Sequence, residues 1–197
     1  MSETNSIVAI YGTDVESESA VMELHKSGFD MRKVSVVAKC SDNGTELVGS
    51  CNIGDRLGDS GIGGAFPAGW GFLVDAAFFE APGTGAVMIG GPLAMGVAAA
   101  IEEAHPIGNL TVIGTALLNV GIPKSTILRY ESALRENKFL LSVHGPSEEV
   151  MKARHILRLT RPEEVSVHFA AEEQPSPAKT SRVSEGLHHT PARQADI

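Results

Sequence analysis

The sequence predicts an α+β fold, namely a ferredoxin-like sheet made of two β-α-β halves and interrupted by a Gly/Ala-rich helical hairpin. A strand–helix–strand pattern of similar length occurs near each end of the chain. Residues 57–123, which lie between the two copies, include no Lys or Arg but hold 14 of the 21 glycines. We therefore divide the chain into a first half with its connector (1–56), the Gly-rich insert (57–123), an amphipathic helix with the second half (124–170) and a disordered C-terminal tail (171–197).

The first half begins with a β-branched run at 6–12, which ends at a glycine and predicts a buried strand. Thr13 and Glu16 follow with the spacing of a capping box, which predicts the start of a helix. Gly28 lies where the C-terminal cap of that helix is expected. A second apolar run at 34–38 predicts the strand that completes this β-α-β unit.

The second half repeats this pattern after an amphipathic helix predicted at 124–137. It has a strand at 139–145 that again stops at a glycine, an N-cap expected at Ser147, and a closing strand at 164–169. Each half alone leaves an apolar sheet face uncovered. We therefore expect the halves to pair in one sheet, with both of their helices on the same face.

Small residues recur at every fourth position of the insert, which is typical of a helix that packs closely against another helix. Such stripes occur between packed membrane helices, and also inside oligomers and cores. We take them as candidate helix-packing and assembly residues, namely Gly61, Ala65 and Gly69 in one stripe and Ala86, Gly90, Ala94 and Ala98 in the other.

The insert also carries an uncharged run at 81–101, close to the length of about 20 residues that a helix needs to cross a bilayer. Asp75 and Glu80 interrupt the preceding apolar stretch, and a carboxylate at mid-bilayer is costly. Arg56 and Lys124 flank the insert and would place both of its ends on one side of the membrane. The polar N-terminal residues do not resemble a secretory signal, so we expect a cytoplasmic protein, with association with the inner membrane through 57–123 as an open alternative.

The composition argues against several chemistries. With 16 Lys+Arg against 24 Asp+Glu, the net charge of −8 argues against nucleic acid as a partner. The seven histidines form no HxxxH pattern, and Cys40 and Cys51 lack metal-ligand spacing, so we predict no metal and no cofactor. The chain also has no nucleophile elbow, so we predict no catalytic residues and no enzymatic activity.

Several short segments together resemble a family of bacterial general stress proteins, sometimes described as heat- or low-temperature-induced. The resemblance covers roughly 7–170 and rests on the segments 9–12, 54–56, 70–71, 78–79, 82–85, 91–93, 121–124, 130–131, 138–141 and 144–145. It implies a membrane-associated or self-associating stress factor with a glycine-rich centre, and it carries over no catalytic residue.

Two functions follow from these observations. The first is a non-enzymatic general stress-response protein that self-associates, or associates with inner-membrane lipid, through its glycine-rich hairpin. The alternative is a soluble homo-oligomeric ferredoxin-like module that senses a small molecule, which rests on analogy at the level of the fold.

Overall fold

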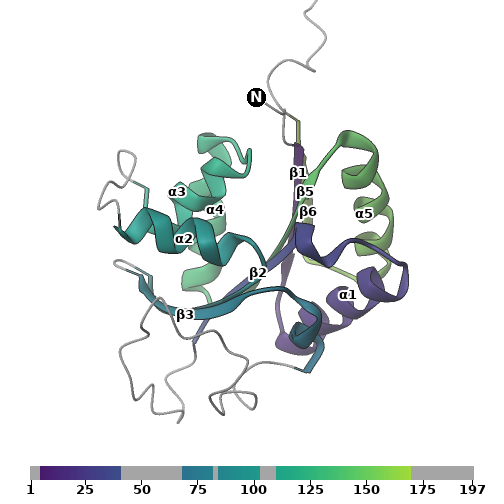
Figure 1. The fold of residues 1–197 in the computed structure, drawn as a ribbon, viewed down its shortest axis with the longest axis horizontal. Helices are drawn as coiled ribbons and strands as arrows, with labels where there is room; N and C mark the ends of the chain where they lie inside the picture. The colour runs from purple at the N-terminus through teal and green to yellow at the C-terminus, as the bar shows by residue number, and fades with distance from the viewer. Residues whose placement is uncertain (1–4, 41–67, 82–83, 103–109, 170–197) are drawn as a thin grey trace, which may run out of the picture.

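The computed structural model describes residues 5–40, 68–81, 84–102 and 110–169. Within these ranges the strands form one open antiparallel sheet in the order β3-β4-β2-β5-β1-β6 (Figure 1). The predicted α+β class is confirmed, and each of the four strands predicted in the two halves is found. The strands are β1 (Asn5–Tyr11), β2 (Val34–Lys39), β3 (Ala76–Ala81), β4 (Gly85–Gly90), β5 (Phe139–Gly145) and β6 (Glu164–His168).

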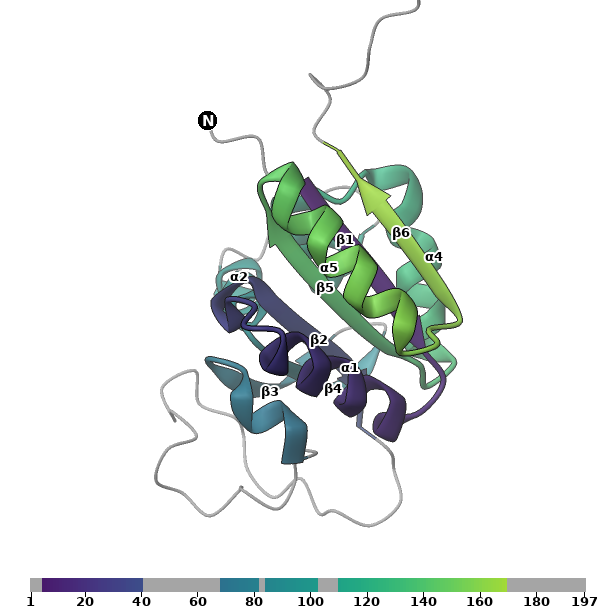
Figure 2. The same ribbon diagram turned by 90° about the vertical axis from the view of Figure 1, so that its right-hand side faces the viewer.

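Helices cover both faces of this sheet (Figure 1). One layer consists of α1 (Asp14–Lys26) and α5 (Ser147–Leu159), which lie side by side in Figure 2. The other layer consists of α2 (Leu93–Glu102), α3 (Val112–Asn119) and α4 (Lys124–Arg135). Because both faces are covered, β1 is buried along its whole length, with Ile7 and Val8 in opposite core clusters.

Local signals in the first half behave as predicted. The Thr13 hydroxyl accepts a hydrogen bond from the Glu16 amide at 3.3 Å, and the Glu16 carboxylate accepts one from the Thr13 amide at 3.2 Å. Gly28 follows the end of α1 with a φ of 68°, a conformation that glycine adopts readily. The N-cap predicted at Ser147 is wrong, because α5 begins at that residue and Pro146 precedes it without a side-chain cap.

The prediction that the insert is a helical hairpin is wrong for residues 76–81 and 85–90. These residues form β3 and β4, which extend the sheet beyond β2. The aromatic pair Phe78 and Phe79 and the run around Ile89 favour strands, and pairing of β3 with β4 and of β4 with β2 satisfies their backbone groups. The α-helices in the described part of the insert are α2 and α3, and they share the core of the flanking halves.

A tight crossing connects β4 to α2 at the resembling segment 91–93. Gly91 has a φ of 94°, and a Cβ atom placed on it would meet the backbone carbonyl of Val34. Leu93 donates its amide hydrogen to the Ser35 hydroxyl at 3.1 Å, so β2 supplies a cap for α2. The glycine therefore permits a close backbone approach that fixes α2 on the sheet.

Residues 170–197, which hold the predicted tail, lie outside the described residues, and so do residues 41–67, which hold most of the predicted connector and the start of the insert. In the described part of the chain, no helix has both the length and the apolar character that crossing a bilayer requires.

Candidate functional site

The predicted stripe of small residues does not form one helical surface. Ala86 and Gly90 lie on β4, whereas Ala94 and Ala98 lie on α2 and are buried in the core that α2 shares with the sheet. Gly69 falls in the 3₁₀-helix η2 (Ala68–Phe72). Gly61 and Ala65 lie outside the described residues. The helical arrangement proposed for Ala86, Gly90, Ala94 and Ala98 is therefore wrong, and an assembly role for the predicted residues stays a prediction.

Gly90 instead makes room for η2. A Cβ atom on Gly90 would lie 2.7 Å from Leu73 Cδ1 and 3.5 Å from Trp70 Cε3. Trp70 is buried in the core on the α1 side, and Phe72 stacks on the ring of His25 with 4.1 Å between ring centroids. Gly90 thus serves the internal packing of η2 and α1.

The apolar residues of the insert that face the solvent are not those of the predicted stripes. On α2, Met95 is 65% exposed and Ala99 is also exposed. Helices α2 and α3, with Val120 directly after α3, also carry apolar side chains that are partly exposed. We use the name α2–α3 surface for all of these residues, namely Met95, Ala99, Ile101, Val112, Leu118 and Val120. Helices α2 and α3 lie close to each other, as a Cβ atom placed on Gly96 would be 3.5 Å from the Cβ atom of Ala116.

This helix pair differs from an ordinary water-facing pair. Glu102 is the one charged residue in the sequences of α2 and α3, and neither helix contains Lys or Arg. A helix that is apolar nearly all round is normally buried. An apolar side that faces outward therefore indicates an interaction surface.

A buried carboxylate fixes α3 against α4. Glu131 is 1% exposed, and its Oε1 accepts hydrogen bonds from the Thr111 amide at 3.0 Å and the Thr111 hydroxyl at 2.8 Å. Its Oε2 lies 3.8 Å from Arg135 Nη2. A Cβ atom on Gly114 would collide with Glu131 Oε1, so the glycine is required for this contact. Glu131 belongs to one of the resembling segments, but no local pattern in the sequence indicates its burial.

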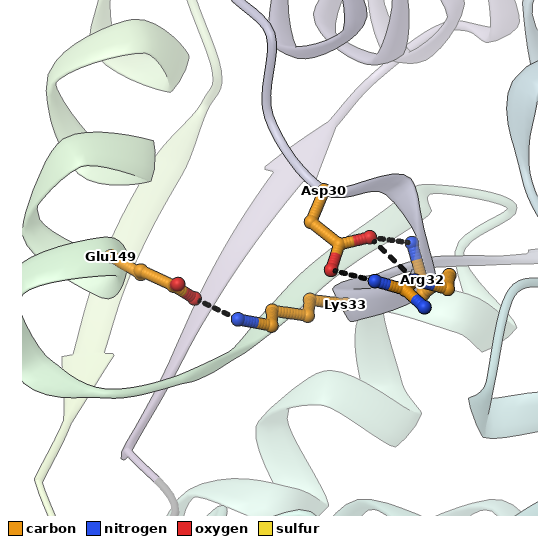
Figure 3. Close-up of polar contacts among 4 residues, drawn as sticks. All are labelled: Asp30, Arg32, Lys33 and Glu149. Atoms are coloured by element: carbon orange, nitrogen blue, oxygen red, sulfur yellow. Dashed lines mark hydrogen bonds and ion pairs between the residues drawn. The ribbon is translucent and has the colours of Figure 1, made fainter.

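Two ion pairs lie where the connection before β2 meets α5 (Figure 3). Arg32 holds the Asp30 carboxylate with two nitrogens, each at 3.0 Å, and these hydrogen bonds lower the pKa of Asp30. Lys33, in the 3₁₀-helix η1 (Met31–Lys33), pairs with Glu149 in the first turn of α5. Both cations are thus already paired with a carboxylate. The Lys33–Glu149 pair links two elements, and we assign it the role of joining η1 to α5.

A groove of about 220 Å³ lies between α4 and the start of β6. Ile10 and Ala133 form its apolar part, and its polar lining consists of Arg129, Ser132, Glu136, Lys138, Glu163 and Glu164. Lys138 Nζ lies 2.9 Å from Glu163 and 3.2 Å from Glu136, and hydrogen bonding to these carboxylates raises its pKa. Each charged group of the groove thus meets a group of opposite charge, and three carboxylates against two cations leave a net charge of −1.

The part of the chain that the structure describes contains no group of three or more His, Cys, Asp or Glu side chains that could hold a metal ion. The predictions that the protein has no cofactor and no enzymatic activity stay predictions.

Comparison of the chain with protein-family models, with curated proteins and with solved structures finds no match. The resemblance to general stress proteins therefore stays an expectation from the sequence.

Proposed function

We propose that the protein is a non-enzymatic stress-response protein that self-associates through the α2–α3 surface. The observation that carries the self-association is the outer side of α2, where Met95 is 65% exposed and the one charged residue, Glu102, lies at the C-terminal end. Burying such a side chain against a partner stabilises a complex by roughly 1.5–3 kcal/mol. The stress-response role rests on the sequence resemblance alone.

The charge of the surface favours a second copy of the chain over a lipid surface. Helices that lie on a membrane carry Lys and Arg on their polar side, and α2 and α3 have neither. With 10 and 8 residues, these helices are also shorter than the roughly 20 needed to span a bilayer. In a twofold dimer the same patch meets itself, and the six residues of the α2–α3 surface bring no charge into that contact.

We also propose that β1-α1-β2 and β5-α5-β6 form a ferredoxin-like unit, to which β3, β4 and the second helical layer are added. The strand order β2-β5-β1-β6 and the position of α1 and α5 on one face support this topology. The alternative function, a small-molecule sensing module, would use the groove beside α4. The mutual pairing of its charges makes that groove a weaker candidate than the α2–α3 surface.

A charge placed on the surface tests the proposal. We expect wild-type protein to show a concentration-dependent increase in sedimentation coefficient, and Met95→Lys to weaken self-association by at least about tenfold. Leu159→Lys is the matched control, because Leu159 is 74% exposed on α5 in the opposite layer. Wild-type protein that stays monomeric, or two variants that behave alike, would overturn the proposal. Flotation of wild-type protein with uncharged phosphatidylcholine vesicles, lost in Met95→Lys, would favour the lipid alternative.

A further inference from the structure

The edge strand β6 is attached to the rest of the fold differently on its two faces. It pairs with β1 over residues 6–10. Val165 and Val167 pack with the apolar core on the α5 side. Their neighbours Glu164, Ser166 and His168 alternate with them, so these three polar side chains lie on the opposite face, toward α4.

Each polar residue of β6 contacts α4 through a side chain. Arg129 Nη2 lies 2.7 Å from Glu164 Oε1 and donates a hydrogen bond to the Ser166 hydroxyl at 3.2 Å. Tyr130 Oη lies 2.7 Å from His168 Nε2, and the two rings meet edge to face. The groove of about 220 Å³ lies beside this contact, where apolar packing would otherwise hold the strand. Strand β6 is therefore held to α4 by polar contacts.

The turn that leads into β6 contains a residue with a strained backbone. Arg161 has a φ of 56°, a left-handed conformation that costs a non-glycine residue free energy, and Pro162 follows it. The five-residue strand thus begins at a strained turn, and its outer edge forms no ladder with another strand of the described sheet.

His168 is the titratable group at the centre of this contact. Its side chain is 7% exposed and faces Tyr130 and Arg129 from α4 and Glu164 from β6 itself. Across the sheet it lies opposite Ser6, which also pairs with His144 of β5. Burial, and next the charge of Arg129, lower the pKa of His168 below 6.5.

We propose that β6 is a releasable edge strand, which separates from α4 and β1 when His168 is protonated. The neutral ring can accept the Tyr130 hydroxyl hydrogen in a dry site, whereas the imidazolium must be buried beside the Arg129 guanidinium. Release exposes His168 to water and restores an ordinary pKa near 6.5. The released form therefore binds more protons than the closed form, so acidification below about 6.5 favours release.

Hydrogen exchange measured by mass spectrometry tests this inference on the full chain, with rates corrected for the intrinsic effect of pH. Between pH 7.5 and 5.5 we expect the protection of β6 to fall by about tenfold, because one proton is taken up on opening. The protection of β2, at the centre of the sheet, should stay unchanged over the same range. In His168→Gln the pH dependence of β6 should disappear.

His155→Gln is the matched control, since His155 is exposed on α5 and should leave the wild-type response intact. The inference fails if wild-type β6 keeps its protection at pH 5.5, or if β2 loses protection together with β6, which would mean global unfolding. The wild-type comparison of β6 with β2 decides the matter even if His168→Gln fails to fold.

Discussion

The helices α1 and α5 on one face of the sheet and the pair α2 and α3 on the other differ in their charges. In the layer of α1 and α5, both helices begin with acidic residues and end with basic ones, as the helix dipole favours. In the other layer, α2 and α3 have no acidic residue in the first turn and no basic residue in the last. Their one charged residue, Glu102, sits at the C-terminal end of α2, where a carboxylate is unfavourable.

The difference indicates how each layer is held to the sheet. The first layer combines an apolar inner side with capping and exposed ion pairs, which contribute little individually. The second relies on close backbone approaches and on the buried carboxylate of Glu131. Substitutions in the second layer should therefore have larger effects on stability than substitutions in the first.

Gly91→Ala should break the attachment of the second layer. The added methyl group would meet the Val34 carbonyl and lie 2.7 Å from Ser35 Cα, and backbone atoms cannot move aside cheaply. We expect a loss of about 4 kcal/mol in the free energy of unfolding, measured by urea denaturation.

Gly85→Ala is the control for backbone conformation. Gly85 has a φ of 89°, close to the 94° of Gly91, but a methyl group there would meet Lys39 Cε at an ordinary 3.8 Å. We expect a cost of about 1 kcal/mol from the left-handed conformation alone. Equal costs for the two variants would show that the close approach at Gly91 is unimportant.

Glu131→Ala should destabilise the protein by about 2–3 kcal/mol. It leaves the amide and hydroxyl of Thr111 without the carboxylate that binds both, and hydrogen bonds to a charged group are the stronger kind. The same chemical-denaturation experiment on Glu102→Ala gives the comparison, because Glu102 is exposed in the same layer and should change stability by less than about 0.5 kcal/mol. A similar small effect at Glu131 would contradict its role in fixing α3.

The sequence patterns that predicted the fold correctly are local ones. The capping box of Thr13 and Glu16 and the apolar runs of β1, β2, β5 and β6 depend on residues close together in the chain. The spacing of Ala86 and Gly90 is also local, but the prediction from it is wrong. A four-residue repeat fits a helix, whereas these residues lie on β4, which pairs with β2.

The candidate surface and the buried carboxylate could be predicted only in part. The absence of Lys and Arg from the insert indicated an unusual surface, yet Ala94 and Ala98 face the core and Met95 faces outward. That choice depends on where the sheet lies. Glu131 is buried because Thr111, 20 positions earlier, meets it in space, and no periodicity encodes that meeting.

The smallest effect is expected in the first layer, at the Lys33–Glu149 ion pair. Both side chains are partly exposed, so Glu149→Gln should cost about 0.5 kcal/mol in dilute buffer, measured by chemical denaturation. Glu148→Gln is the matched control, because Glu148 is exposed in the same first turn of α5 and shares its helix dipole. The difference between the two variants isolates the ion pair, and it should vanish at 1 M salt, where the screening length is about 3 Å. A difference that persists at high salt would mean that Glu149 stabilises the fold through packing, and the two layers would then differ less than their charges indicate.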